Sequence, residues 1–211
     1  MTAVQAGFSS KRIGVFGGAF DPPHNAHVVL AQAALQRLAL DQLLVVPTGH
    51  AWHKTRALSA SEHRLTMAQL AFGDLPNTQV DGREVRRPGP TFTIDTLKAL
   101  QLENPGGQLH LIMGADQFAA FDQWHQWEAI LEIAIICIAD RAISTGAKTR
   151  FDASAAHGSR FLMLPMPLMP VSATQIRQLV SSKPGDATRI LGMVPPAVAR
   201  YIALNQLYST V

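Results

Sequence analysis

The chain has 211 residues, of which 47% are hydrophobic and 16% charged, and its formal net charge is +3. This size and apolar content allow a sizeable buried core, and the mild positive charge suits small anionic ligands. The sequence has no Lys/Arg-rich block of the kind that tracks a nucleic-acid backbone, and its one cysteine, Cys137, excludes an intramolecular disulfide. No apolar run reaches the roughly 18 residues that a membrane span needs, and residues 1–11 lack a secretory pattern. We therefore expect a soluble, cytoplasmic protein.

The predicted elements alternate between strand and helix. Residues 13–16 are a short apolar run that predicts a buried strand, and residues 28–40 carry apolar side chains at helical spacing. A second strand is predicted over 42–47 and a loop over 48–60. Ser59 and Glu62 then offer a capping box for a helix that runs to about residue 72. Residues 78–85 indicate a strand, 93–102 a helix and 109–113 a strand.

The same alternation continues to the end of the chain. We expect a short helix over 127–133, a strand over 134–139, a loop with a helical turn over 140–160 and a last strand over 161–164, before helices at 174–182 and 197–208. Apolar strands alternating with helices predict an α/β fold, a Rossmann-like, doubly wound and mainly parallel sheet. We expect one domain over 1–211, with a helical C-terminal subregion from about 171 to 211. Ligands of such sheets bind beyond the carboxyl ends of the strands, so Gly17-Gly18, Pro47-Thr48 and Gly114 should share one rim.

The most informative segment runs from Gly17 to His27 and reads Gly-Gly-Ala-Phe-Asp-Pro-Pro-His-Asn-Ala-His. A strand that turns through glycines into a helix directs backbone N–H groups and the positive helix end at one point, which is typical of a phosphate site. His24 and His27 lie on one face of the first helical turn, so both can reach the same phosphate. Half a zinc site and a pair of solvated surface histidines are the alternatives. Zinc needs three or four ligands, and the chain has no HExxH or CxxC pattern.

A second segment with phosphate chemistry runs from Val171 to Arg177 and reads Val-Ser-Ala-Thr-Gln-Ile-Arg. Ser172 can cap the helix, which leaves free N–H groups and the Thr174 hydroxyl for phosphate oxygens. Arg177 lies one turn further on and can add charge-assisted hydrogen bonds to the same phosphates. Taken alone, this segment would be interpreted as an ordinary capped helix with a solvated arginine.

Together the two segments resemble the H-x-G-H and I-S-[ST]-T-x-[IV]-R elements of the nucleotidyltransferase superfamily, with Ala26 where the superfamily usually has glycine. The resemblance implies a reaction at the α-phosphorus of ATP, with His24, His27 and Arg177 as catalytic residues. It implies no metal ligand from the protein, because Mg²⁺ would be carried by the ATP phosphates. The implied ATP-binding residues are Gly17, Gly18, Phe20, Asp21, His24, His27, Gly114, Asp116, Ser172, Thr174 and Arg177.

Two further segments resemble bacterial nicotinate-mononucleotide adenylyltransferases. Residues 89–97 read Gly-Pro-Thr-Phe-Thr-Ile-Asp-Thr-Leu, and residues 121–128 read Phe-Asp-Gln-Trp-His-Gln-Trp-Glu. An electron-poor pyridine favours an aromatic face, which makes Trp124 the natural stacking platform, whereas we interpret Trp127 as a core anchor. Backbone N–H groups near Thr93 and the ring of His125 can bind the pyridine carboxylate.

The resemblance therefore implies transfer of AMP from ATP to nicotinate mononucleotide, which gives deamido-NAD and pyrophosphate in NAD biosynthesis. The expected partners are these two substrates, without nucleic acid or membrane, and the sequence leaves open whether the protein is a monomer or a homo-oligomer. The implied residues for nicotinate mononucleotide are His53, Lys54, Thr93, Trp124, His125 and Arg141.

Three alternatives stay open. A nucleotidyltransferase with another acceptor, such as pantetheine phosphate, is disfavoured by the Trp124-His125 segment and by the length of the chain. A nucleotide-binding regulator without catalysis is disfavoured by the intact His24, His27 and Arg177. A nucleic-acid-binding module is disfavoured because the chain has no basic stripe.

Overall fold

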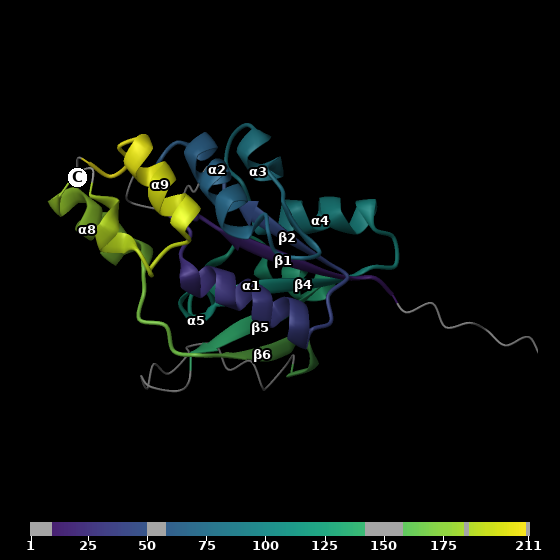
Figure 1. Cartoon of the computed structure of the whole chain (residues 1–211). Coiled ribbons are helices and arrows are strands. Elements are labelled where there is room, and N and C mark those ends of the chain that lie inside the picture. Colours follow the sequence, from purple (N-terminus) through teal and green to yellow (C-terminus); the bar gives the residue numbers. More distant parts are fainter. Residues whose placement is uncertain (1–9, 50–57, 142–157, 184–185, 210–211) are drawn as a thin grey trace, which may run out of the picture.

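The computed structural model describes residues 10–49, 58–141, 158–183 and 186–209 (Figure 1). Its centre is a six-stranded sheet with the order β3-β2-β1-β4-β5-β6, in which all neighbouring strands are parallel. The strand order changes direction between β1 and β4, so the predicted α/β, doubly wound parallel sheet is confirmed. The strands are β1 (Arg12–Gly18), β2 (Gln42–Pro47), β3 (Thr78–Val80), β4 (Gln108–Gly114), β5 (Ala134–Arg141) and β6 (Phe161–Met166).

Helices cover both faces of the sheet, because alternate side chains of the strands enter two separate cores. In β1, Ile13 and Val15 pack with α4, α5 and α6, while Phe16 packs with α1 and α2. The helices on the first face are α4 (Thr93–Glu103), α5 (Ala115–Phe118) and α6 (Trp127–Ile133). Those on the second face are α1 (Asn25–Arg37) and α2 (Ser61–Phe72).

The C-terminal residues form a helical unit beside α2 and the start of α1 (Figure 1). It consists of α8 (Ala173–Ser182), η3 (Ala187–Ile190) and α9 (Pro196–Leu204), and its apolar side chains pack with Met67 of α2. The side chain of Asn25 donates to the carbonyl of Gly192 at 2.7 Å, and its backbone N–H donates to that of Met193 at 2.9 Å. The start of α1 is therefore hydrogen-bonded to the loop before α9. That residues 1–211 form one domain stays a prediction.

The described residues also include the short helical turns α3 (Arg83–Arg86), η1 (Phe121–Gln123) and η2 (Gly158–Arg160). Within the described ranges, no helix is long and apolar enough to cross a membrane.

Some predicted boundaries were wrong, each for a physical reason. The strand expected over 78–85 ends at Val80, because Asp81 accepts the N–H of Arg83 at 2.8 Å and turns the chain into α3. The capping box of Ser59 and Glu62 does not form, since α2 begins after Ala60 without a side-chain cap. The apolar run at 28–40 belongs to a helix that ends already at Arg37; it begins at Asn25 with His24 as its N-cap, so the two histidines lie at its first turn as predicted.

Candidate active site

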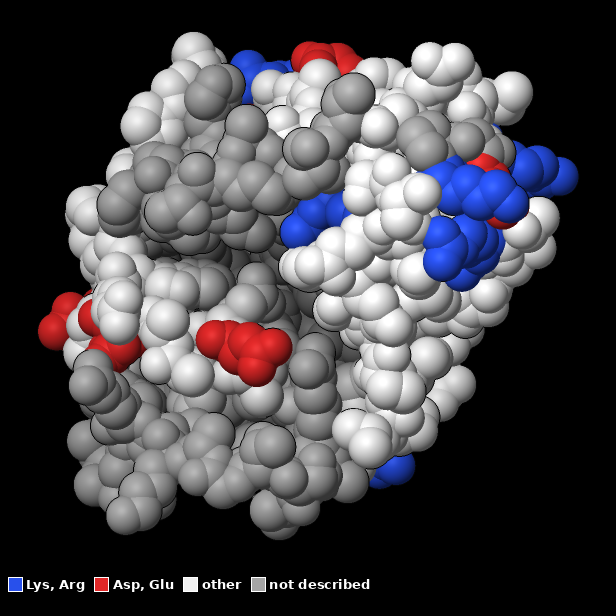
Figure 2. All heavy atoms as spheres, turned by 90° about the vertical axis from the view of Figure 1, so that its left-hand side faces the viewer, with Lys and Arg blue, Asp and Glu red and all other residues white. Residues whose placement is uncertain are grey.

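Two adjoining cavities lie at the carboxyl ends of β1 and β4, where the strand order changes direction. The larger has a volume of about 600 Å³ and the smaller about 200 Å³. Gly17, Gly18, Ala19 and Gln117 line both cavities, so the two spaces share one wall. Figure 2 shows the molecule from the side at which these strands end, with a hollow near the middle of the face and a basic side chain at its rim. The shared rim predicted from the parallel sheet is therefore present.

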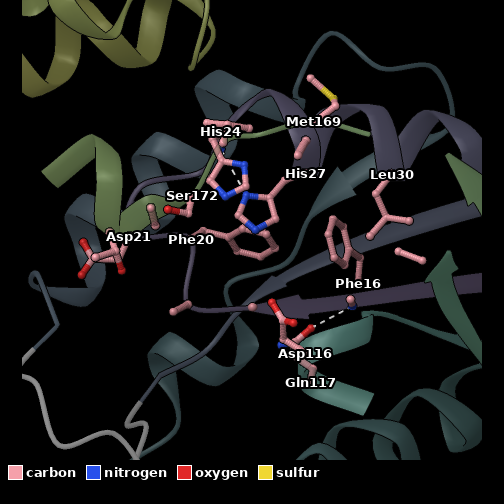
Figure 3. Close-up of a pocket in the computed structure, with 18 of the residues that line it drawn as sticks. Phe16, Phe20, Asp21, His24, His27, Leu30, Asp116, Gln117, Met169 and Ser172 are labelled. Atoms are coloured by element: carbon pink, nitrogen blue, oxygen red, sulfur yellow. Dashed lines mark hydrogen bonds between the residues drawn. The ribbon is translucent and has the colours of Figure 1, made fainter. Parts of the chain in front are cut away.

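All the residues predicted to bind ATP line the larger cavity. The end of β1 and the start of α1 form one side, α5 and the end of β4 lie across from it, and the start of α8 closes a third side. Figure 3 shows His24 and His27 pointing into this space, with Asp116 and Gln117 across from them. The lining residues from the prediction are Gly17, Gly18, Phe20, Asp21, His24, His27, Gly114, Asp116, Ser172, Thr174 and Arg177.

The turn between β1 and α1 depends on Gly18 and Phe20. A Cβ atom on Gly18 would lie only 2.9 Å from the ring of Phe20, so this position admits no larger residue without movement of that ring. Phe20 is buried and has a left-handed backbone with φ of 47°, which a bulky residue rarely adopts. Its ring packs edge-on against Phe16 and His27, with centroid distances of 5.4 and 5.3 Å. This packing holds the strained turn that brings the N-terminus of α1 over the end of β1.

The two histidines are organised by the N-terminus of α1. The backbone N–H of His24 donates to Nδ1 of His27 at 3.1 Å (Figure 3). Because Nδ1 accepts this bond, the neutral ring of His27 carries its proton on Nε2, where it can be donated to a ligand. The two rings stack with their centroids 3.7 Å apart. Both imidazoles are therefore held close together at a helix N-terminus, which is a favourable place for an anion.

The start of α8 brings a guanidinium group to the same cavity. Ser172 caps α8 as predicted, since its hydroxyl accepts the N–H of Gln175 at 3.2 Å. Arg177 donates from Nη2 to the hydroxyl of Thr174 at 3.0 Å and from Nη1 to the carbonyl of Asp21 at 2.8 Å. The last of these bonds joins residues 156 positions apart in the chain. It connects the segment at 17–27 to the segment at 171–177.

The carboxylate of Asp21 connects this site to the end of the chain. Asp21 is 2% exposed, and it accepts the hydroxyl of Tyr208 at 2.7 Å and the backbone N–H of Ser59 at 3.2 Å. Burial raises the pKa of Tyr208, and the charge of Asp21 adds to this effect, so the phenol stays a hydrogen-bond donor.

The smaller cavity contains the aromatic residues of the predicted acceptor site. Thr93, Trp124 and His125 all line it. The ring of His125 lies against Phe92 at the start of α4, with a centroid distance of 4.4 Å. Trp124 is half-buried and packs partly against the core of the sheet. Trp127 also packs against this core and lines neither cavity, in agreement with its interpretation as an anchor.

The side chains of three residues predicted to bind nicotinate mononucleotide lie outside the described part of the structure. His53 and Lys54 lie outside the described residues. Arg141 is the last residue of β5, and its side chain belongs to the part of the chain that is not described.

Two buried charged residues near the cavities were not predicted from the sequence. Arg64 of α2 is 2% exposed, and Glu84 of α3 is 7% exposed and lines the smaller cavity. Burial lowers the pKa of Arg64 and raises the pKa of Glu84. Arg64 could have been noticed from its spacing, because it continues the buried stripe formed by Met67, Ala68 and Phe72.

Comparison with known proteins gives consistent results over most of the chain. Residues 15–179 match the model of the cytidylyltransferase-like family. A protein of Albidiferax ferrireducens named "Probable nicotinate-nucleotide adenylyltransferase" is 54% identical over 200 residues, which cover 95% of this chain and 99% of that protein. A protein of Methylibium petroleiphilum with the same name is 38% identical over 199 residues, covering 94% of this chain and 93% of its own length.

Solved structures of low sequence identity share the fold. The nicotinic acid mononucleotide adenylyltransferase of Plasmodium falciparum complexed with APC superposes with a TM-score of 0.72 at 20% identity, covering 94% of this chain and 98% of that one. The same enzyme complexed with NaAD gives a TM-score of 0.72 at 19% identity, with the same coverage.

Proposed function

The chain belongs to the cytidylyltransferase-like family and, within it, to the nicotinate-nucleotide adenylyltransferases, and from this membership we propose which of its two cavities takes which substrate. The enzyme transfers AMP from ATP to nicotinate mononucleotide and releases deamido-NAD and pyrophosphate, a step of NAD biosynthesis. We assign ATP to the larger cavity and nicotinate mononucleotide to the smaller one.

The assignment of ATP rests on the donors that converge on the larger cavity. The N-termini of α1 and α8 both face it, so the positive ends of two helices are directed at the phosphate oxygens. His24, His27 and Arg177 add side-chain donors, and Arg177 is held in place through Asp21 and Thr174. Asp116, on the opposite wall, is the group we assign to the ribose of ATP.

The assignment of nicotinate mononucleotide rests on the aromatic lining of the smaller cavity. Trp124 offers a face on which the pyridine ring can stack. Thr93 opens α4, where the N–H groups of the first helical turn are available to the pyridine carboxylate, and His125 offers a ring nitrogen. We also assign His53, Lys54 and Arg141 to this substrate, on the resemblance described above.

The wall shared by the two cavities is the observation that carries the proposed mechanism. Gly17, Gly18, Ala19 and Gln117 border both spaces, so the phosphate of one substrate can meet the triphosphate of the other along the end of β1. A phosphate oxygen of nicotinate mononucleotide attacks the α-phosphorus of ATP, the bond to the β-phosphate oxygen breaks, and pyrophosphate leaves. The nucleophile is already an anion, so no general base is required. Catalysis then consists of alignment and of charge stabilisation on the phosphoryl oxygens.

The two glycines at the centre of this wall suit the close approach of phosphates. A Cβ atom added to Gly17 would meet no protein atom within 4 Å, so a side chain there would project into open space beside the cavities. Any larger residue at position 17 would therefore compete with the substrates for the space in which the reaction occurs.

Mg²⁺ enters this mechanism with the nucleotide. Magnesium prefers oxygen ligands and keeps several waters, so ATP phosphates are suitable carriers. Within the described ranges there is no group of three or more His, Cys, Asp and Glu side chains that could hold a metal ion. When bound, the ion would neutralise phosphate charge, while the histidines and Arg177 orient the triphosphate. We also propose a cytoplasmic location, which suits an enzyme that uses ATP and whose one cysteine, Cys137, is buried and in no disulfide.

The proposal is tested by the release of pyrophosphate from ATP with different acceptors compared side by side. Nicotinate mononucleotide, nicotinamide mononucleotide and pantetheine phosphate are offered separately, and we expect release with the first. Release with pantetheine phosphate alone would mean that the smaller cavity is wrongly assigned. No release with any acceptor would favour the nucleotide-binding regulator.

A further inference from the structure

Arg64 joins the loops that form the shared wall. Its guanidinium group donates from Nη1 to the carbonyl oxygens of Ala19 and Thr48, from Nη2 to that of Gly49, and from Nε to that of Ser59. Ala19 follows β1 and lines both cavities, while Thr48 follows β2 and lines the smaller cavity. One buried side chain therefore fixes the loop after β1 against the loop after β2.

These four bonds require the shape of arginine. A guanidinium group presents five N–H donors in a planar fork, whereas a lysine ammonium group is a compact point with three donors. The carbonyl groups that Arg64 contacts come from separate loops, up to 45 positions away in the chain. A single ammonium group at this position cannot bond to all of them at once.

Glu84 makes a corresponding set of contacts on the acceptor side. Its Oε1 accepts the hydroxyl of Thr96 at 2.8 Å, and the nearby hydroxyl of Thr91 and backbone N–H of Gly49 lower the pKa of its carboxyl group against the effect of burial. Thr91 lines the smaller cavity just before α4, and Thr96 lies in the first turns of that helix. Glu84 therefore holds the start of α4 against the loop after β2.

The peptide of Gly49 is the place where the two sets of contacts meet. Its carbonyl oxygen accepts from Arg64 at 2.9 Å, and its N–H is near enough to the carboxyl group of Glu84 to lower the pKa of that group. A Cβ atom at this position would lie 2.1 Å from the carbonyl oxygen of Glu84, so only glycine fits without displacement of the backbone of α3. The buried cation and the buried carboxyl group therefore meet at one peptide whose Cα has no room for a side chain.

We propose that Arg64 and Glu84 are a pair of positioning residues that set the separation of the two cavities, with the peptide of Gly49 as the connection between them. Neither residue needs to touch the reacting atoms. Arg64 fixes the loop after β1, which borders both cavities, and Glu84 fixes the start of α4 beside the acceptor. Both are held against the loop after β2, and in-line attack depends on the distance between these walls. This inference rests on the proposed distribution of substrates between the cavities.

The test compares ligands that occupy one cavity with a ligand that spans both. Dissociation constants of ATP, nicotinate mononucleotide and deamido-NAD are measured by calorimetry for the full-length enzyme and for Arg64→Lys, Arg64→Met and Glu84→Gln. Arg64→Met removes every donor and is the variant most at risk of not folding, so Arg64→Lys, which keeps the charge, is the second variant. Leu38→Ala is the matched control, because Leu38 is a buried core residue at the far end of α1 that lines neither cavity.

We expect the dissociation constant of deamido-NAD to rise about tenfold or more in Arg64→Lys and Glu84→Gln, while those of ATP and nicotinate mononucleotide alone change by less than about threefold. Leu38→Ala should lower the melting temperature and leave all three constants unchanged. The proposal would be overturned if the dissociation constants of all three ligands rose by the same factor. It would also be overturned if the rise for deamido-NAD did not exceed the product of the rises for ATP and nicotinate mononucleotide. Failure of the unaltered enzyme to bind deamido-NAD would instead refute the proposed function.

Discussion

His27 is the residue whose replacement tests the proposed phosphate site most directly. Its Nδ1 is occupied by the backbone N–H of His24, so the ring has one donor, Nε2, to offer to a phosphate. Replacing His27 by Asn keeps an acceptor close to the position of Nδ1 and removes the donor at Nε2. Loss of one preorganised donor to a developing charge costs about 2.7–4 kcal/mol of transition-state stabilisation, so kcat should fall by about a hundredfold to a thousandfold.

The assay is the steady-state rate of pyrophosphate release, with thermal unfolding measured in parallel. His27→Ala should lose the same activity and also some stability, because the N–H of His24 then lacks its acceptor at the start of α1. His27→Gln can place an amide N–H near Nε2 and should recover part of the rate. A near-normal kcat for His27→Asn would remove His27 from the catalytic residues and refute the reasoning from its tautomer.

Four further predictions concern separate parts of the molecule. Trp124→Ala should raise KM for nicotinate mononucleotide by about tenfold and leave that for ATP nearly unchanged, and equal increases would mean that Trp124 is only structural. Burial lowers the pKa of His110 below its usual 6.5, so the free energy of unfolding should fall as the pH drops below that value, and His110→Leu should reduce this loss in urea titrations. Tyr208→Phe removes the hydrogen bond from the phenol to the buried Asp21 and should lower the free energy of unfolding by about 1.5–3 kcal/mol, a cost that urea denaturation would measure. Burial raises the pKa of the Cys137 thiol to about 12, so a thiol reagent should modify it only in unfolded protein, and rapid modification of the folded enzyme would contradict its burial.

Hydropathy patterns predicted the elements that are governed by burial alone. The second strand and the helix over 127–133 have the predicted bounds, since an apolar run defines the strand and apolar side chains at helical spacing define the helix. Sequence patterns for local hydrogen bonds, such as the capping box, were less reliable where residues distant in the chain bond to the same side chain or backbone groups. Ser59 was expected to cap α2, but its N–H donates to Asp21 and its carbonyl accepts from Arg64. Both partners are set by tertiary structure, which a four-residue pattern does not contain.

The candidate site likewise contains residues with a local sequence signal and residues without one. The residues expected to meet ATP were predictable because two helix starts with Ser, Thr, His and Arg in fixed spacing carry their own chemical signal. Arg64 and Glu84 carry no such signal, because their partners are mostly backbone groups of loops elsewhere in the chain. The buried position of Arg64 on α2 could be inferred from helical spacing, but the identity of the carbonyl groups that it contacts could not.

The position of the proposed phosphate site also depends on residues far along the chain, in its C-terminal helical unit. Asp21 is bonded to Tyr208, 187 positions later, and Asn25 to Gly192, 167 positions later. Contacts across such distances gain nothing until the intervening chain is ordered, since the entropy of closing the loop must be overcome first. The turn at Phe20 is therefore secured both by the nearby rings of Phe16 and His27 and by C-terminal residues whose contacts require the intervening chain to be ordered. Because Arg177 joins the proposed triphosphate site from α8 and bonds to the carbonyl of Asp21, the C-terminal helices complete that site as well as support it.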